Sequence, residues 1–186
     1  MQKVVFLDRD GVINEDSPDY IKNVHEFQFI PGSLESIVKL SQAGFQIFIL
    51  TNQSGIARGL FSLSTLADIH EFLVTSVEKK GGKITGIFFC PHLPEEACDC
   101  RKPKTGLFER AKELYDIDMA NAIMIGDSAK DIIAATKAGI KTTLLVQSGY
   151  TPIDQILPEL SPNTPSIILK DLLQATDWIL SKEVPV

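Results

Sequence analysis

Short apolar runs rich in valine, isoleucine and phenylalanine alternate along this chain with longer segments whose apolar residues recur at helical spacing. Such alternation is typical of parallel strands joined by crossover helices. The predicted strands are residues 4–7, 46–50, 84–89, 122–125 and 142–146. We therefore expect a doubly wound α/β parallel sheet in a single domain spanning residues 1–186, with any ligand beyond the carboxyl ends of the strands.

Glycines and polar caps bound the helical segments between these strands. The predicted helices are residues 34–40, a segment from the Ser62 N-cap to Gly81, residues 107–114 and residues 131–138. Residues 152–165 are rich in turn formers, and residues 167–180 predict a last short strand and a helix.

The composition argues against several classes of protein. The formal net charge is −6, and no run of lysine or arginine forms a patch that could neutralise a phosphate backbone, so nucleic acid is not an expected partner. No stretch of about eighteen apolar residues is present, and the chain enters its first strand without a signal sequence, so we expect neither a membrane span nor secretion. All three cysteines lie between Cys90 and Cys100, which is unlike a secreted disulfide framework and favours a reducing cytoplasm.

Polar side chains follow several of the predicted strands. Asp8 and Asp10 come directly after the first strand, and Asp127 and Asp131 follow the fourth. After the second strand, residues 51–55 offer hydroxyl and amide groups suited to phosphate oxygens, and residues 101–104 bring cations to the same edge. Because the carboxyl ends of parallel strands meet at one edge of a sheet, we expect these groups to converge.

Any one of these aspartates, taken alone, is most simply a turn former or a helix cap. Four carboxylates close together, however, would repel one another unless a cation lies among them. Oxygen ligands beside a phosphoryl group form the environment that Mg²⁺ prefers. The residues therefore predict a magnesium site and phosphoryl-transfer chemistry.

The cysteines belong to a second cluster, whose members are Cys90, His92, Cys98 and Cys100. Three thiolates and one imidazole are suitable ligands for tetrahedral Zn²⁺, and four protein ligands indicate a structural site. The alternatives are reduced surface cysteines beside an incidental histidine, or a strained Cys98–Cys100 disulfide, which a reducing compartment disfavours. A zinc ion would fix the loop that directly precedes Arg101 and Lys102.

The aspartate motifs resemble those of the haloacid-dehalogenase (HAD) superfamily of phosphatases. The matching residues are Asp8-x-Asp10-Gly11, Thr51 after a strand, Lys102 before a helix, and Gly126-Asp127-x-x-x-Asp131. The resemblance implies a Mg²⁺-dependent phosphatase with a HAD-like Rossmannoid sheet. The spacings between the motifs leave no room for a separate cap domain.

The resemblance also implies a role for each motif residue. Asp8 is the expected nucleophile, which would carry the phosphoryl group as an aspartyl-phosphate. Asp10 is the expected acid and base for the leaving oxygen and the hydrolytic water. The expected magnesium ligands are the Asp8 carboxylate, the Asp10 backbone carbonyl and Asp127, with Asp131 orienting them. The residues expected to stabilise the phosphoryl oxygens are Thr51, Asn52 and Lys102.

Longer motifs at residues 8–14, 51–59 and 98–103 resemble a branch of the superfamily that removes the 7-phosphate of a heptose 1,7-bisphosphate; its nearest relatives hydrolyse histidinol phosphate. The implied partner is a small phosphosugar, bound by a monomer through loops at residues 14–29 and 54–60 and the zinc loop. The residues expected to contact substrate are Asn14, Asn52, Gln53, Ser54, Arg58, Arg101 and Lys104. A basic rim of Arg58, Arg101 and Lys104 favours a bisphosphate over histidinol phosphate, whose amine is cationic.

Two alternatives come from other functional classes. A signalling receiver would also carry a phospho-aspartate, but it predicts the phosphate acceptor on a later strand. A zinc-dependent interaction module would use the cysteine cluster and would leave the aspartates unexplained.

Overall fold

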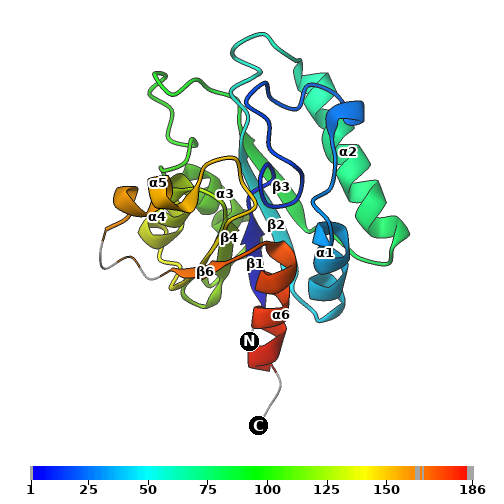
Figure 1. Cartoon of the computed structure of the whole chain (residues 1–186), viewed down its shortest axis with the longest axis vertical. Helices are drawn as coiled ribbons and strands as arrows, with labels where there is room; N and C mark the ends of the chain where they lie inside the picture. The colour runs from blue at the N-terminus through cyan, green and yellow to red at the C-terminus, as the bar shows by residue number, and fades with distance from the viewer. Residues whose placement is uncertain (1, 162–163, 165, 184–186) are drawn as a thin grey trace.

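The computed structural model describes residues 2–161, 164 and 166–183. Within them the chain forms a six-stranded parallel sheet of order β3-β2-β1-β4-β5-β6 (Figure 1). The strands are β1 (Val4–Leu7), β2 (Gln46–Asn52), β3 (Gly86–Cys90), β4 (Ile123–Gly126), β5 (Thr142–Val146) and β6 (Ile167–Leu169). The predicted doubly wound α/β sheet is confirmed.

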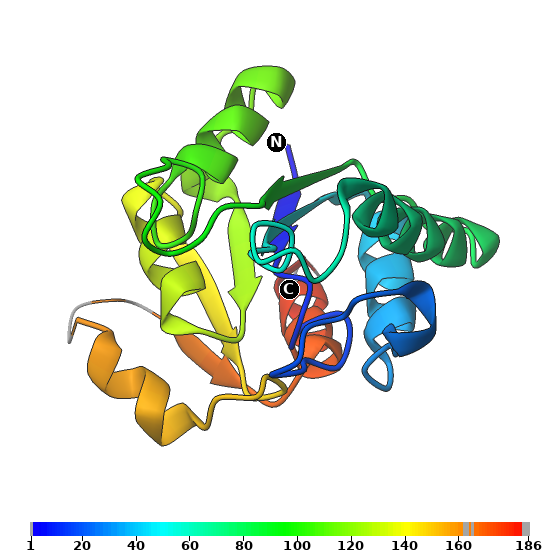
Figure 2. The same ribbon diagram turned by 90° about the horizontal axis from the view of Figure 1, so that it is seen from above.

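Helices cover both faces of the sheet, as the view from above shows (Figure 2). One layer contains α1 (Ser33–Gln42), α2 (Leu63–Lys79) and α6 (Leu172–Glu183), and the other contains α3 (Gly106–Tyr115) and α4 (Ala129–Lys137). The short helix α5 (Ile153–Ile156) follows β5, inside the segment predicted as turns. Residues 162, 163 and 165 of that segment lie outside the described residues.

The two helix layers explain why the strands are apolar without interruption. In β1, Val5 and Leu7 face the α1, α2 and α6 layer, whereas Val4 and Phe6 face the other layer. All four side chains are at most 1% exposed. Strands buried on both faces lose the alternation of polar and apolar residues that a half-exposed strand shows.

The element boundaries differ from prediction where pairing or capping decides them. β2 extends to Asn52, two residues beyond the prediction, because Thr51 and Asn52 pair with residues 89 and 90 of β3. β3 accordingly begins and ends later than predicted. α4 begins at Ala129 rather than at Asp131, because Ser128 and Asp131 form a capping box that starts the helix earlier.

The sheet places a crevice between β1 and β4. The chain proceeds from β1 to β2 and β3 on one side and from β4 to β5 and β6 on the other, so the winding direction changes at this point. Ligands of doubly wound sheets bind at such a switch point, beyond the carboxyl ends of the strands. No helix in the described part of the chain is long and apolar enough to cross a bilayer.

Candidate active site

Three carboxylates meet at the carboxyl edge of β1 and β4. Asp8 directly follows β1, Asp127 directly follows β4, and Asp131 lies in the first turn of α4. Their ligand atoms all lie within 4.8 Å of one another. Asp127 and Asp131 are buried, and the Asp8 side chain is 15% exposed. The local chain path, set by two strand ends and one capped helix start, therefore builds the acidic cluster predicted from the sequence.

Lys102 supplies a positive charge inside this cluster. Its Nζ lies 3.0 Å from Asp8 Oδ1 and 2.6 Å from Asp131 Oδ1, and it donates a hydrogen bond of 2.6 Å to the Leu50 carbonyl. The side chain is 1% exposed. Burial acts to lower the pKa of Lys102, but Asp131 and Asp8 outweigh burial and raise it, so the amine stays charged.

One lysine does not neutralise the cluster. Burial, with smaller contributions from Asp131 and Asp10, raises the pKa of Asp8 to about 7 despite the opposing effect of Lys102. Burial and the neighbouring Asp131 and Asp8 also raise the pKa of Asp127 well above its usual range. Buried carboxylates that resist ionisation in this way are stabilised by a divalent cation with oxygen preference, so the donor set fits Mg²⁺.

Two glycines leave the space that the Asp127 carboxylate occupies. A Cβ atom on Gly11, whose φ is +81°, would lie 2.3 Å from Asp127 Oδ2. A Cβ atom on Gly149, in the loop after β5, would lie 1.9 Å from the same oxygen. Ser148 joins the two loops by donating a 2.7 Å hydrogen bond to the Gly11 carbonyl. Any larger residue at either position would have to displace the carboxylate.

The Asp10 carboxylate is held by three buried donors. Arg9 donates through Nε and Nη2, Asn14 Nδ2 donates at 2.9 Å, and Gln53 Nε2 donates at 2.8 Å. Burial acts to raise the pKa of Asp10, but Arg9 and the two amides together bring it below the ordinary value. Asn14, expected to contact substrate, is fully buried, and its amide is engaged by Asp10 and the Glu15 carbonyl.

A cavity of about 230 Å³ opens at this edge of the sheet. The predicted site residues that line it are Asp8, Asp10, Thr51, Asn52, Gln53, Ser54, Arg101, Lys102, Asp127 and Asp131. Asn52 exchanges two 3.1 Å hydrogen bonds with the Lys102 backbone, which fixes the lysine relative to β2. The segment predicted to grip substrate contributes Asp16, Ser17, Tyr20 and Ile21.

The predicted cationic rim is only partly present. Arg58 is exposed and does not line this cavity, because the turn after β2 carries it outward. Lys104 is also exposed, and its amine donates to the Cys98 carbonyl. Lys130, which sequence analysis missed, lines the cavity beside Arg101. The sequence feature that could have indicated Lys130 is its position in the first turn of α4, three residues after Asp127.

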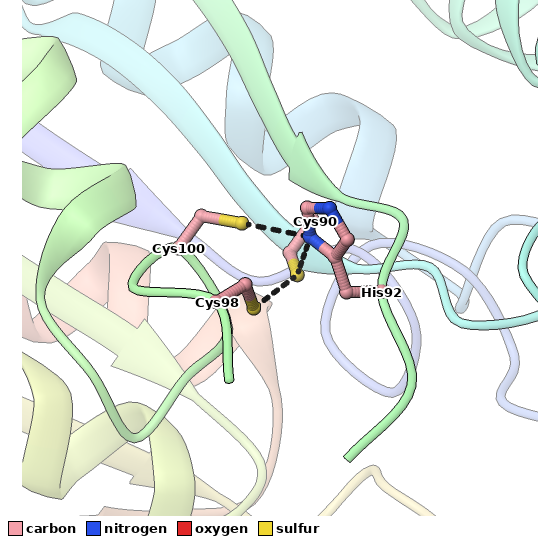
Figure 3. Close-up of side chains that lie close together, drawn as sticks. All are labelled: Cys90, His92, Cys98 and Cys100. Atoms are coloured by element: carbon pink, nitrogen blue, oxygen red, sulfur yellow. Dashed lines mark hydrogen bonds between the residues drawn. The ribbon is translucent and has the colours of Figure 1, made fainter. Parts of the chain in front are cut away.

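The second cluster lies where β3 ends (Figure 3). Cys90 is the last residue of β3 and is buried, and the other three ligand candidates come from the loop that follows. His92 Nδ1 lies 3.5 Å from Cys90 Sγ and 3.3 Å from Cys100 Sγ, and Cys90 Sγ lies 3.7 Å from Cys98 Sγ. Burial raises the pKa of the Cys90 thiol to about 12, with Cys100 adding to the effect.

These separations suit a tetrahedral metal ion. Zinc–ligand bonds of about 2.3 Å to sulfur and about 2.0 Å to nitrogen place ligand atoms about 3.5–3.8 Å apart at the tetrahedral angle. A disulfide needs sulfur atoms about 2.05 Å apart, and all three cysteines are free. The donor set and its spacing therefore fit zinc, and the disulfide alternative is wrong.

Comparison with known proteins agrees with this geometry. A family profile described as HAD-hydrolase-like matches residues 99–175. The chain is 44% identical over 147 residues to a D-glycero-beta-D-manno-heptose-1,7-bisphosphate 7-phosphatase from Bordetella bronchiseptica, covering 79% of this chain and 82% of the relative. It is 36% identical over 181 residues to the protein of the same name from Neisseria meningitidis, covering 97% and 96%. The chain belongs to the heptose-1,7-bisphosphate 7-phosphatase family of HAD-like hydrolases.

Solved structures of this heptose-bisphosphatase family share the fold. The crystal structure of D,D-heptose 1,7-bisphosphate phosphatase from B. bronchiseptica, complexed with magnesium and phosphate, has a TM-score of 0.90 and 38% identity. It covers 97% of this chain and 99% of its own. The enzyme from Burkholderia thailandensis has a TM-score of 0.72 at 33% identity, with the same coverage. Membership of the heptose-bisphosphatase family decides against the receiver and interaction-module alternatives.

For this heptose-bisphosphatase family member we expect one tightly bound zinc ion per chain. His92→Asn should weaken zinc binding and lower activity at least about tenfold, because the loop that carries Arg101 and Lys102 loses its anchor. His25→Asn, at an exposed histidine outside the cluster, is the matched control. Elemental analysis after chelator washing, followed by a phosphatase assay, checks the expectation. A zinc-free protein with full activity would contradict a structural role.

Magnesium should stabilise this heptose-bisphosphatase family member more at about pH 8 than at about pH 5. The folded Asp8 carboxyl, with a pKa of about 7 against a reference of 3.8, binds more protons than the unfolded chain between these values. In that window Asp8 therefore lowers the free energy of unfolding as pH rises, and the cation, which needs the ionised form, removes the penalty. Thermal unfolding with and without saturating Mg²⁺ measures this. Equal shifts at both pH values would contradict the assignment.

Proposed function

We propose that this chain removes the 7-phosphate of D-glycero-D-manno-heptose 1,7-bisphosphate in a Mg²⁺-dependent reaction that passes through an aspartyl-phosphate on Asp8. The observation that carries the proposal is Asp8 at the end of β1, paired with Lys102 and next to Asp127. The names of the relatives, and the magnesium and phosphate in the B. bronchiseptica structure, support it. Because the relatives are named for the beta anomer, we assign the same anomer to this chain.

Asp8 is placed to attack phosphorus with one oxygen while the other is held. Asp8 Oδ1 accepts a 2.8 Å hydrogen bond from the Arg9 backbone N–H and forms a 3.0 Å ion pair with Lys102 Nζ. None of the hydrogen bonds among the described residues goes to Oδ2. In the first step the Asp8 oxygen bonds to phosphorus and the bond from phosphorus to the sugar oxygen breaks. Asp10 gives that oxygen a proton, which it must bind together with the substrate because Arg9 and the two amides favour its ionised form in the free enzyme.

In the second step Asp10 acts as a base. Water attacks the phosphorus of the aspartyl-phosphate, Asp10 takes the proton from that water, and Asp8 leaves as a carboxylate. Asp10 thereby regains the proton that it gave to the sugar oxygen in the first step. Each step conserves protons without another acid or base.

The carboxylates of Asp8 and Asp127 and the backbone carbonyl of Asp10 would hold Mg²⁺. When bound, the ion neutralises charge on the reacting phosphoryl oxygens. One oxygen of Asp131 forms an ion pair with Lys102, and the other accepts hydrogen bonds from the Ser128 backbone N–H and hydroxyl. Asp131 therefore holds the Lys102 amine in place beside Asp8. Thr51, Asn52 and Lys102 are the assigned donors to the phosphoryl oxygens.

The cysteine cluster would hold Zn²⁺ as a structural ion, with Arg101 attached to it by a 3.3 Å hydrogen bond from Nη1 to the His92 carbonyl. Thiolate ligands persist in a reducing compartment, which supports a cytoplasmic location. We assign a monomer that acts on a small phosphosugar.

The second phosphate of the substrate should lie against Arg101 and Lys130. Both residues also line an adjoining cavity of about 470 Å³, which Lys104 and the acidic Glu96 and Glu159 share. Lys130 has no hydrogen bond or ion pair with any described residue, so its amine is available for a ligand. The rim therefore offers cations to a phosphate that is not cleaved.

We expect Lys130→Ala and Arg101→Ala each to lower kcat/KM for the bisphosphate roughly ten- to hundredfold, the value of one charge-assisted contact. A sugar monophosphate should lose much less, because it has no second anion. Arg58→Ala, outside the cavity, is the control and should behave like wild type. Equal losses on both substrates would mean that these cations serve the reacting phosphoryl group or the fold.

The proposed function is tested by comparing kcat/KM for both anomers of heptose 1,7-bisphosphate and for histidinol phosphate, with Mg²⁺ and with a chelator. We expect the heptose bisphosphate to be preferred by at least an order of magnitude and the activity to require Mg²⁺. A preference for histidinol phosphate would overturn the substrate assignment and leave the phosphatase assignment in place.

A further inference from the structure

Arg9 is an arginine completely enclosed by the protein. It stands between the two motif aspartates, and its side chain is 0% exposed. It does not line the catalytic cavity. Burying a guanidinium without an acidic partner would be costly, so its contacts should explain its presence.

Among the residues that the structure describes, Asp10 accepts every side-chain hydrogen bond of Arg9. Nε donates to Oδ1 at 3.1 Å, and Nη2 donates to Oδ1 at 2.8 Å and to Oδ2 at 2.9 Å. The third nitrogen, Nη1, is buried and has no partner among the described residues. The guanidinium of Arg9 therefore binds a single carboxylate. It does so through two nitrogens of its planar group, a geometry that a lysine amine cannot reproduce.

Two amides complete the support of Asp10. Asn14 binds Oδ1, and Gln53 binds Oδ2 while also donating to Thr51 Oγ1 at 2.8 Å. Asn14 is 0% exposed and Gln53 is 2% exposed, so neither can move freely. With three donors on one oxygen and two on the other, rotation of the carboxylate would break several hydrogen bonds at once.

We propose that Arg9 is a positioning residue for the phosphatase reaction: it fixes the orientation of the Asp10 carboxylate for proton transfer and never touches the substrate. The inference rests on the proposed function, because it needs Asp10 to act as acid and base. A misplacement of about 1 Å in a catalytic group can cost about a hundredfold in rate. The effect should therefore appear in kcat, should leave KM nearly unchanged, and should vanish when Asp10 can no longer transfer protons.

The experiment compares Arg9→Met and Arg9→Lys with wild type, with Arg110→Met at an exposed arginine of α3 as the matched control. The substrates are an alkyl phosphate, whose leaving oxygen needs a proton, and 4-nitrophenyl phosphate, whose leaving group needs none. Formation of the phosphoenzyme is followed in single-turnover experiments. For the alkyl ester we expect Arg9→Met to slow this step about 10- to 100-fold, with KM changed less than about threefold. Arg9→Lys should recover only part of the loss.

The aryl ester and the double variant separate positioning from a structural role. With 4-nitrophenyl phosphate, Arg9→Met should form the phosphoenzyme at nearly the wild-type rate. With the alkyl ester, adding Arg9→Met to Asp10→Asn should change the rate of phosphoenzyme formation less than about twofold, because without the Asp10 carboxyl there is no proton transfer for Arg9 to support. If Asp10→Asn is too unstable to assay, the comparison of the two esters in Arg9→Met decides the question alone.

Three results would overturn the inference: equal losses on both esters, a rise in KM without a fall in kcat, or a further loss of the same size in the Asp10→Asn background. In each of them wild type remains an active phosphatase, so only the role of Arg9 fails. If wild type hydrolyses neither ester nor the heptose bisphosphate, the proposed function fails and the role of Arg9 fails with it.

Discussion

Asp8→Asn is expected to abolish phosphate release, with a fall in kcat of at least about 10⁴-fold. An amide is neither a nucleophile toward phosphorus nor a good ligand for Mg²⁺, so the variant loses the covalent step and part of the metal site together. Removal of a nucleophile from a catalytic unit that acts together costs about as much as removal of the whole unit. Phosphate release and trapping of the phosphoenzyme by acid quench both measure this loss.

The same variant should be at least as stable as wild type when metal is absent. The raised pKa of Asp8 means that the ionised carboxylate is disfavoured in the fold, and the neutral amide removes that penalty. A thermal unfolding temperature equal to or above that of the metal-free wild type would show that the inactive variant is folded. Retention of more than a few per cent of the wild-type rate would refute Asp8 as the nucleophile.

Lys102→Met should lower kcat about 10²- to 10³-fold. Its amine is the only cation that contacts both Asp8 and Asp131 among the described residues, and it is placed to stabilise charge that develops on the phosphoryl oxygens. Methionine keeps most of the volume of the side chain and removes the charge, so packing changes little. The rate is measured with the heptose bisphosphate at saturating Mg²⁺.

Lys102→Met should also destabilise the fold, by about 3 kcal/mol, because breaking a buried ion pair leaves carboxylates without a partner. Lys112→Met, at an exposed lysine of α3, is the matched control and should change neither rate nor stability by much. A Lys102→Met enzyme with normal kcat would show that the amine serves only the fold.

The strands and the motif aspartates could be predicted because both depend on local sequence. A strand buried between two helix layers is a short apolar run, and a residue directly after such a run lies at the carboxyl edge whatever the rest of the chain does. Asp8 and Asp127 were placed correctly for that reason. The cysteine cluster was predictable in the same way, since three of its four ligand candidates lie in one short loop after β3.

Other features depend on the path of the loops and could not be read from local patterns. The rim assignment of Arg58 depended on the direction of the turn after β2, which no periodicity specifies. The role of Arg9 was hidden because arginine is usually exposed, and only the closed turn at residues 9–14 shows that it is buried. The start of α4 at Ala129 could have been predicted from the sequence, because a serine followed three residues later by an acidic residue is a typical helix-capping pattern.

The glycines around Asp127 have a consequence for how the chain can change over time. Gly11 and Gly149 contribute no side chain to the reaction, yet the space that each leaves is occupied by the carboxylate that completes the metal site. Selection on catalysis therefore acts on the loop after β5 through volume rather than through chemical function. Other residues of that loop can be substituted, but even alanine at position 149 would place its Cβ atom in the space that the Asp127 carboxylate occupies.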